Sequence, residues 1–242
     1  IKNQNLIKPV QLEGLRVVGD PNIFAKKYYE EGADEIFFLD SVASLYQRSY
    51  LEDIIENSVK DIFIPITVGG GIKSTNDVER ILRIGADKIS INTAAVHRPD
   101  IINEVSNEFG SQCMVVSIEA KQMSEDLWVV YTNNGREKTS INVTEWIKQV
   151  QDLGAGEIIL TSIDKEGTRR GFDVQLIETI HKFIKIPLIV SGGMGNISDI
   201  HEIIEYKNIS GVAMADFIHF ERMKISEIKK DLLTANVEVR NF

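Results

Sequence analysis

The stretch GADEIFFLD, residues 32–40, returns in the same frame as GADKISINT at 85–93 and as GAGEIILTS at 154–162. Each copy starts with Gly-Ala at the end of a helical pattern, passes one further residue and a charged residue, and enters an apolar run. Strands that repeatedly follow helices are typical of parallel strands joined by crossover helices. The repeat therefore predicts an α/β fold with a parallel sheet.

Seven apolar runs predict strands, and amphipathic stretches such as 76–84 and 144–153 predict helices between them. Because the runs are apolar throughout, each strand needs cover on both of its faces. The runs are IFFLD (36–40), IFIPITV (62–68), KISIN (88–92), MVVSIE (114–119), EIILTS (157–162), IPLIVS (186–191) and GVAMA (211–215).

An eighth strand would close a (βα)8 TIM barrel, and we expect it before or at the very start of the sequence. VGGGIKS (68–74) resembles SGGMGNIS (191–198), which predicts a barrel built from two similar half-barrels. No break in composition indicates a linker, so we expect one barrel domain over 1–242, with its first strand partly or wholly missing. Asp20 and Pro21 mark the N-cap and first position of the first clear helix. The residues before them predict a long loop over the barrel mouth, with a short hairpin of its own.

Composition excludes several classes of protein. The 242 residues include one cysteine, Cys113, so an internal disulfide is excluded and a reducing, cytoplasmic setting is expected. No apolar run approaches the roughly 18 residues of a membrane span, so we expect neither a membrane span nor a secretory leader. The net charge of −9 argues against nonspecific nucleic-acid binding. The four histidines lack ligand spacing, so neither a metal nor a cofactor is expected.

Two glycine clusters, GGGIKS and SGGMGN, each follow a predicted strand and precede a predicted helix. Glycine lets backbone N–H groups approach an anion, and the loops after the last strands of such barrels often hold phosphate. A single cluster is as well explained by a tight turn. Two at matching places predict a ligand with two phosphates, and Asn92 and Thr93 lie beside the first cluster.

Charged residues start three of the predicted strands: Glu35, Lys88 and Glu157. Alternation along a strand would place all three on the inward face, at the floor of the barrel. Ordinary solvation of strand ends is one explanation. Since burying an ion pair is costly, a plug or gate made by the opposite charges is the other.

Glu119 ends an apolar run at the opposite end of the barrel, on the same face as Ser117. A carboxylate at this rim is a candidate general acid or base if burial tunes its pKa. The alternative is a solvated strand end. The charged loop 164–173 is likewise either a solvated face or a lid that brings Arg169 and Arg170 to an anion.

Ordered motifs along nearly the whole chain resemble the HisF family, the cyclase subunit of imidazole glycerol phosphate synthase in histidine biosynthesis. The motifs are GDP, GADEIFFLD, IPITVGGGI, GADKISINTAAV, FGSQCMVVSIEAK, GAGEIILTSIDKEGT, GFD, SGGMG and IHF. The resemblance implies a (βα)8 barrel with a glutaminase subunit docked on its floor. It also implies that ammonia crosses the barrel to the mouth, where a bisphosphorylated aminoimidazole precursor is cleaved and cyclised.

The resemblance assigns roles to individual residues, with two in catalysis: Glu119 as the acid–base residue and Lys8 in a mobile first loop that closes over the substrate. It places Glu35, Lys88 and Glu157 at the ammonia gate and Asp87 at the glutaminase contact. The small inward side chains of Thr67, Ser90 and Ser117 suit the passage of a small polar molecule. The substrate and phosphate contacts that it implies are Gly71, Asn92, Thr93, Thr161, Ser191, Gly192, Gly193 and, at a position where the family has a small hydroxyl, Asp216.

Departures from the family pattern keep a second function open. The family uses two aspartates: the position of one would fall just before Ile1, outside the given sequence, and the position of the other is occupied by Glu119, which is one methylene longer. Asp216 could repel a phosphate, although an Asp is also a good N-cap. A paralogous ammonia conduit for amidation of an acetamido sugar in surface-polysaccharide biosynthesis is therefore the alternative. A third alternative is a sugar isomerase built on the same half-barrel plan. It is less favoured, because such an enzyme would not explain the charged residues at the floor of the barrel.

Overall fold

The computed structural model describes residues 1–41, 51–206 and 208–240. Its strands are β1 (Leu6–Val10), β2 (Glu13–Gly19), β3 (Ile36–Leu39), β4 (Ile66–Gly69), β5 (Lys88–Ile91), β6 (Met114–Ser124), β7 (Leu127–Thr132), β8 (Glu137–Asn142), β9 (Glu157–Ser162), β10 (Leu188–Ser191) and β11 (Ile209–Ala213). Its α-helices are α1 (Pro21–Glu30), α2 (Leu51–Ser58), α3 (Thr75–Ile84), α4 (Thr93–His97), α5 (Asp100–Phe109), α6 (Val143–Asp152), α7 (Val174–Ile180), α8 (Ser198–Ile203), α9 (Asp216–His219) and α10 (Ile225–Thr234).

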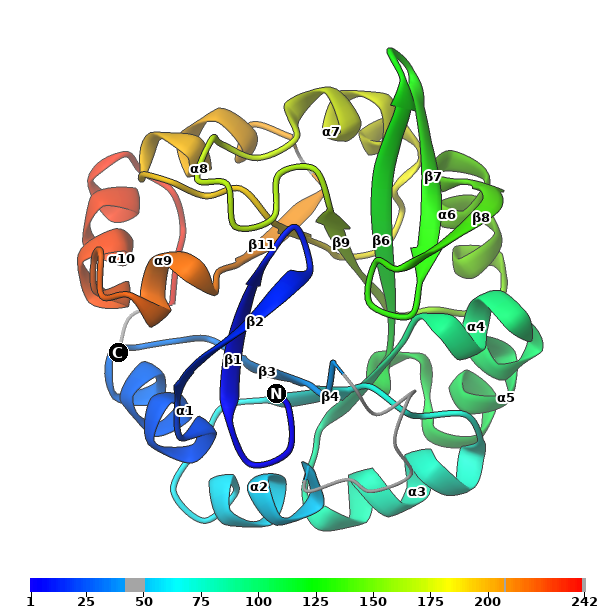
Figure 1. The fold of residues 1–242 in the computed structure, drawn as a ribbon, viewed down its shortest axis with the longest axis horizontal. Coiled ribbons are helices and arrows are strands. Elements are labelled where there is room, and N and C mark those ends of the chain that lie inside the picture. The colour runs from blue at the N-terminus through cyan, green and yellow to red at the C-terminus, as the bar shows by residue number, and fades with distance from the viewer. Residues whose placement is uncertain (42–50, 207, 241–242) are drawn as a thin grey trace.

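Parallel strands form the centre of the molecule in the order β11-β10-β9-β6-β5-β4-β3, and the helices surround them (Figure 1). The order follows the chain, which confirms the predicted α/β fold with crossover helices. At the β3 edge, the Ile1 amine donates a hydrogen bond of 2.5 Å to the Leu39 carbonyl. The Ser41 N–H in turn donates to the Ile1 carbonyl at 3.0 Å. The start of the chain thus lies at the edge where we expected the eighth strand.

The backbone conformation explains why the glycine of the Gly-Ala motif is repeated. Gly32, Gly85 and Gly154 have φ values of +93°, +121° and +99°, a region that side chains rarely adopt. Gly85 closes α3, and its N–H donates to the carbonyls of Ile81 and Leu82 in the last helical turn. A glycine that ends a helix in this way reverses the chain into the following strand. The same local geometry thus explains the three copies of the motif.

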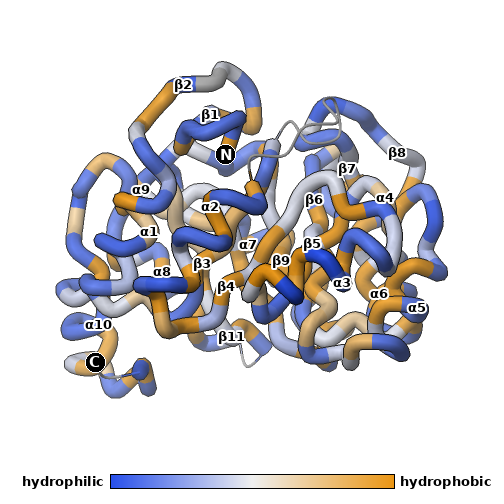
Figure 2. Tube along the Cα trace, turned by 90° about the horizontal axis from the view of Figure 1, so that it is seen from below, coloured by the Kyte–Doolittle hydropathy of each residue, from blue (hydrophilic) through white to orange (hydrophobic). Residues whose placement is uncertain are grey.

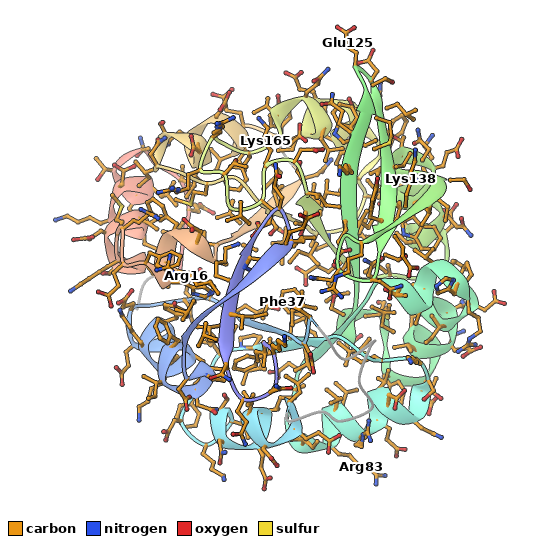
Figure 3. All side chains as sticks on the ribbon, viewed as in Figure 1. Arg16, Phe37, Arg83, Glu125, Lys138 and Lys165 are labelled. Atoms are coloured by element: carbon orange, nitrogen blue, oxygen red, sulfur yellow. The ribbon has the colours of Figure 1, made fainter. Side chains whose placement is uncertain are left out.

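The core lies between the strands and the surrounding helices. Ile89, Ile118 and Leu160, in the middle of three central strands, are at most 1% exposed. In Figure 2 the strands are largely hydrophobic, whereas the surrounding helices mix hydrophobic and hydrophilic stretches. On β3, the buried residues Ile36 and Phe38 alternate with the half-buried Phe37 and Leu39. Phe37 lies toward the middle of the ring of strands (Figure 3).

The hairpin β1–β2 crosses one end of the barrel, as Figures 1 and 2 show from two directions. This hairpin confirms the one predicted before the first helix, and α1 starts at Pro21 with the Asp20 carboxylate accepting from two N–H groups. We call this end, where the carboxyl ends of the parallel strands lie, the mouth. The opposite end is the floor. Among the described helices, none is long and apolar enough to cross a membrane.

One expectation about the mouth was wrong: Glu119 does not end its strand. β6 runs on to Ser124 and returns as β7, pairing Glu119 with Tyr131, and β7 then pairs with β8. The β6–β7 hairpin projects from the barrel with Glu125 at its tip (Figures 1 and 3). This antiparallel pairing gives the end of β6 a second neighbour, which is why the strand extends beyond the barrel and covers Glu119.

Candidate functional site

The three charged residues predicted at the floor meet in one ion-pair ring. Lys88 Nζ lies 2.7 Å from Glu35 Oε2 and 2.7 Å from Glu157 Oε2. The side chains are 22%, 23% and 13% exposed, respectively, so the ring is shielded without being cut off from water. Thr67 on the neighbouring strand donates its hydroxyl to the other Glu35 oxygen. The prediction that these residues face one another is confirmed.

The charge state of Lys88 follows from this ring. Burial by itself lowers its pKa, but the hydrogen bonds and negative charges of Glu157 and Glu35 outweigh burial and raise the pKa above its ordinary value. Lys88 is therefore held as a cation between two carboxylates. Such a ring is a poor source of stability, because desolvation of the ions opposes their attraction.

Glu119 lies at the other end of the barrel and is only 7% exposed. The strand register places it beside Thr161 of β9, which in turn pairs with Ser191 of β10. Its Oε2 accepts a hydrogen bond of 2.7 Å from the Gly135 N–H, in the turn between β7 and β8. The structure therefore brings together three of the predicted mouth residues on adjacent strands.

Burial raises the pKa of Glu119 from its ordinary 4.5 to about 7, against the opposing effect of hydrogen bonds from Gly135 and the Asn92 side chain. A carboxyl group with this pKa exists in both protonation states near neutral pH. Glu119 can thus donate a proton in one step and accept one in another. This is the behaviour expected of a general acid or base.

A cavity of about 430 Å³ opens beside Glu119. Its wall combines the first predicted glycine cluster, polar residues of the strand ends, and the β7–β8 turn. The residues that carry these features are Asp40, Gly70, Gly71, Ser90, Asn92, Thr93, Ser117, Glu119, Asn133 and Asn134. One cavity therefore joins a candidate anion cradle to the candidate acid–base group.

The first glycine cluster has the geometry that its composition predicted. Gly70 and Gly71 have φ values of +102° and +73°. A Cβ on Gly70 would lie 2.4 Å from the Asp40 carbonyl oxygen, so only glycine fits there. Thr93 is fixed nearby, because its hydroxyl accepts a 3.0 Å hydrogen bond from the Asn133 N–H.

The second cluster lies against the loop after β9 and is surrounded by charges. Gly192 and Gly193 have φ values of +93° and +110°. A Cβ on Gly192 would lie 3.3 Å from a Glu166 carboxylate oxygen. Asp216, the expected source of repulsion, is paired: its Oδ1 lies 3.2 Å from Arg222 Nε and 3.9 Å from Arg169 Nε. The negative charge that the sequence places here is thus balanced within the chain.

Lys8 lies on the mouth hairpin, as predicted, but its ammonium group contacts Glu166 and not the Glu119 cavity. It forms an ion pair with Glu166, and its side chain is 4% exposed. Burial lowers the pKa of Lys8 to about 8, while the charge of Asp216 acts in the opposite direction. In the described part of the chain, Lys8 is not among the residues that line the Glu119 cavity.

Asp87, predicted at a partner contact, is exposed near the floor between α3 and β5. Its Oδ2 accepts a 2.8 Å hydrogen bond from the Ile66 N–H. This contact fixes the carboxylate and leaves part of it open to solvent. No group of three metal-ligating residues occurs within the described ranges.

Several residues of the mouth were missed in the sequence, among them Asp40, Asn133, Asn134, Gly135 and Glu166. Asn134 and Gly135 belong to an Asn-Asn-Gly segment between LWVVYT and TSIN, which is a recognisable hairpin signal. Asp40 ends an apolar strand run, the same signal that singled out Glu119. Nothing in the local pattern distinguishes Glu166 from its charged neighbours.

Comparison with known proteins places the chain in a family. Residues 1–224 match a family model described as histidine biosynthesis protein. The chain is 53% identical to an imidazole glycerol phosphate synthase subunit HisF of Legionella pneumophila over 199 residues, 82% of this chain and 94% of the relative. It is 45% identical to the protein of that name from Bacillus cereus strain G9842, over 99% of the chain and 95% of the relative. The corresponding values for Lactococcus lactis subsp. cremoris are 44%, 99% and 93%.

Proposed function

The chain belongs to the HisF family, the cyclase subunits of imidazole glycerol phosphate synthase in histidine biosynthesis, and we propose how its residues carry out that lyase reaction. The proposed reaction cleaves and cyclises a bisphosphorylated aminoimidazole precursor with ammonia from a glutaminase partner. The observation that carries the proposal is the buried carboxyl group of Glu119 in the wall of a cavity that also holds a glycine cradle.

In this proposal, one phosphate binds at the first cradle, where Gly71, Asn92 and Thr93 line the cavity. The reacting part of the substrate then lies next to Glu119. With a pKa of about 7, Glu119 protonates the departing group and removes a proton during ring closure. The neighbouring Thr161 hydroxyl is a further polar contact for the substrate at the same level of the barrel.

The second phosphate binds across the mouth, at Ser191, Gly192 and Gly193. The positive φ values of the two glycines support this assignment, because such backbone exposes N–H groups to an anion. Asp216 does not exclude a phosphate here, since Arg222 and Arg169 already balance its charge. Lys8 closes the hairpin over this side of the mouth through its ion pair with Glu166.

Ammonia enters through the floor in this proposal, and Glu35, Lys88 and Glu157 form the gate. The ring has the geometry of a closed ionic plug, because one ammonium group bridges two carboxylates. Thr67, Ser90 and Ser117 provide small, buried polar side chains above it. The glutaminase subunit docks at the floor and contacts the exposed Asp87. We infer one domain over residues 1–242.

We also infer a cytoplasmic location. The buried thiol of Cys113 and the place of the family in histidine biosynthesis support this inference. Cell fractionation checks it directly: the protein is expected with cytoplasmic markers, and a membrane-bound or secreted fraction would contradict the location.

The direct test incubates the purified protein with the bisphosphorylated precursor and an ammonium salt at high pH, where free ammonia is plentiful. Formation of imidazole glycerol phosphate is the expected result, and loss of it in Glu119→Gln ties the activity to this site. A wild-type protein that stays folded, binds the glutaminase and gives no product would overturn the cyclase assignment.

A second candidate function is supported by Asp216. This residue turns part of the second cradle into an internal carboxylate–guanidinium cluster, which suits an acceptor with one phosphate or none. The chain would then stimulate a glutaminase and conduct ammonia toward an acetamido sugar for surface polysaccharide. Glutaminase stimulation without cyclase turnover is the outcome that favours this function.

A further inference from the structure

The turn between β7 and β8 has an unusual backbone. Asn133, Asn134 and Gly135 have φ values of +52°, +59° and +75°, so three successive residues occupy the left-handed region. Only Gly135 does so without cost; asparagine tolerates the region better than most residues but still pays roughly 1 kcal/mol. Positive φ values at Asn and Gly are also what a tight hairpin turn requires, so the contacts of the turn, and not its backbone alone, show what it does.

The strained turn is held by contacts to predicted site residues. The Asn133 N–H donates to the Thr93 hydroxyl at 3.0 Å, and the Gly135 N–H donates to Glu119 at 2.7 Å. Asn92 adds a third connection, because its Nδ2 donates to the Tyr131 carbonyl at 3.1 Å, just before the turn. The turn therefore joins the first cradle to the acid–base residue.

The middle residue of the turn makes no such contact. Among the described residues, Asn134 Nδ2 is a buried donor without a partner, and Asn92 Oδ1 and Ser90 Oγ are likewise buried without partners. All three residues line the Glu119 cavity. Buried polar atoms without a hydrogen bond cost free energy, so three around one cavity call for a ligand that pairs with them.

We propose that Asn134 is a substrate-binding residue that, together with Asn92, recognises neighbouring oxygen groups on the sugar-derived part of a phosphorylated substrate. Asn134 Nδ2 donates to a keto or hydroxyl oxygen, and Asn92 Oδ1 accepts from a hydroxyl. A purely apolar or purely anionic group cannot pair with both atoms. The proposal rests on the proposed function in one respect: the phosphate of the same substrate occupies the cradle of Gly70 and Gly71.

Glycerol 3-phosphate and inorganic phosphate are suitable probes, because they share a phosphate and differ by a hydroxyl-bearing chain. Their affinities for the full-length protein are measured by NMR titration. The test variant is Asn134→Gly, which removes the amide donor and relieves the left-handed backbone. The matched control is Asn236→Gly, since Asn236 is exposed, has a φ of +60° and lies after α10, far along the chain from the turn.

Asn134→Gly is expected to weaken binding of glycerol 3-phosphate roughly 3- to 10-fold, the value of one hydrogen bond, and to leave inorganic phosphate binding unchanged. Its unfolding midpoint should equal or exceed that of the wild type. Asn236→Gly should change neither affinity. With the bisphosphorylated precursor, Asn134→Gly should raise KM by a similar factor, while inorganic phosphate binding stays at the wild-type level; a role confined to turn formation predicts that the two change together.

Equal weakening of both probes would overturn the proposal, because it would mean that Asn134 only shapes the cradle. Unchanged affinity for both would overturn it as well, and so would a wild type that gains nothing from the glycerol chain. None of these outcomes contradicts the cyclase assignment, which is tested separately by the turnover assay. A wild type that binds neither probe contradicts both this proposal and the phosphate cradle on which the proposed function depends.

Discussion

Lys8 of the β1–β2 hairpin and Glu166 of the loop after β9 form a buried ion pair that joins the hairpin to the far side of the mouth. Two neighbouring contacts strengthen this attachment. The Gln11 N–H donates to the Glu166 carbonyl at 2.9 Å, and Leu12 packs against a small cluster of Val129, Tyr131 and Ile163. The hairpin is thus held in place by charge, backbone and apolar contacts together.

Glu166→Gln is expected to loosen this hairpin. The substitution leaves the Lys8 ammonium buried without its carboxylate, which costs about 3 kcal/mol in comparable buried pairs. Amide hydrogen exchange in β1 and β2 should become faster, while exchange in β9 stays slow. Replacing both partners, as Lys8→Met with Glu166→Leu, should restore slow exchange, because no unpaired charge remains. Equal protection in the single variant and the wild type would show that the ion pair does not hold the hairpin.

Glu119→Gln is expected to lower cyclase turnover by about 10²- to 10⁴-fold, the usual contribution of a positioned acid–base group. The wild-type pH–rate profile should show an apparent pKa near 7, which the variant loses. Affinity for inorganic phosphate should stay unchanged, because the carboxyl group is not part of the glycine cradle. A variant that keeps wild-type turnover would remove Glu119 from the mechanism.

Glu119 should also make folding stability depend on pH. Its pKa is about 7 in the folded chain against an ordinary 4.5, so between these values the folded state retains a proton that the unfolded state releases. This stabilisation is complete below pH 4.5 and is lost as the pH rises through 7. Relative to Glu119→Gln, the wild type should therefore lose about 3 kcal/mol of unfolding free energy over this range. Urea denaturation of both proteins at several pH values measures the difference, and parallel curves would contradict the pKa shift.

Lys88→Met should open the floor ring, because Glu35 and Glu157 then repel each other without an intervening cation. A loss of about 2 kcal/mol in unfolding free energy is expected, less than for a fully buried pair because the ring is partly exposed. If the ring gates ammonia, the ratio of glutamine-driven to ammonium-driven turnover should change. Arg83→Met is the control, since the 78% exposed Arg83 pairs with Glu79 at the outer surface of the barrel (Figure 3). An unchanged ratio in Lys88→Met would exclude a gating role.

Asp216→Ser should turn the second cradle into a stronger anion site. The substitution removes one negative charge and frees Arg222 and Arg169, which now lie 3.2 Å and 3.9 Å from Asp216 Oδ1. Inorganic phosphate should bind about tenfold more tightly at this side of the mouth, equivalent to about 1.4 kcal/mol. Two-dimensional NMR titration locates the gain, which should fall on the backbone amides of Gly192 and Gly193. No gain there would mean that the cluster does not face the ligand.

Much of the site could be predicted, because in a barrel of parallel strands the position of a residue along its strand decides at which end of the barrel it lies. Lys88 and Glu157 each start a strand and Glu35 immediately precedes one, and parallel strands bring these positions to one end of the barrel. The same rule placed Glu119 and the two glycine clusters at the mouth. The β6–β7–β8 extension was not predicted, although LWVVYT and the Asn-Asn-Gly turn carried a hairpin signal. The prediction assumed that each strand stops at the barrel rim, and antiparallel pairing beyond the rim depends on residues distant in sequence.

The sequence by itself determined the order of the parallel barrel strands and their crossover helices, the ends of the barrel and the residue types at each end, because periodicity and glycine geometry act locally. Only the tertiary structure decided the state of the charges. Burial raises the pKa of Glu119 against the hydrogen bonds of Gly135 and Asn92, Asp216 is balanced by Arg222 and Arg169, and Lys8 pairs with Glu166, 158 residues away. Electrostatic energy depends on burial and on distance in space, and neither can be read from separation along the chain.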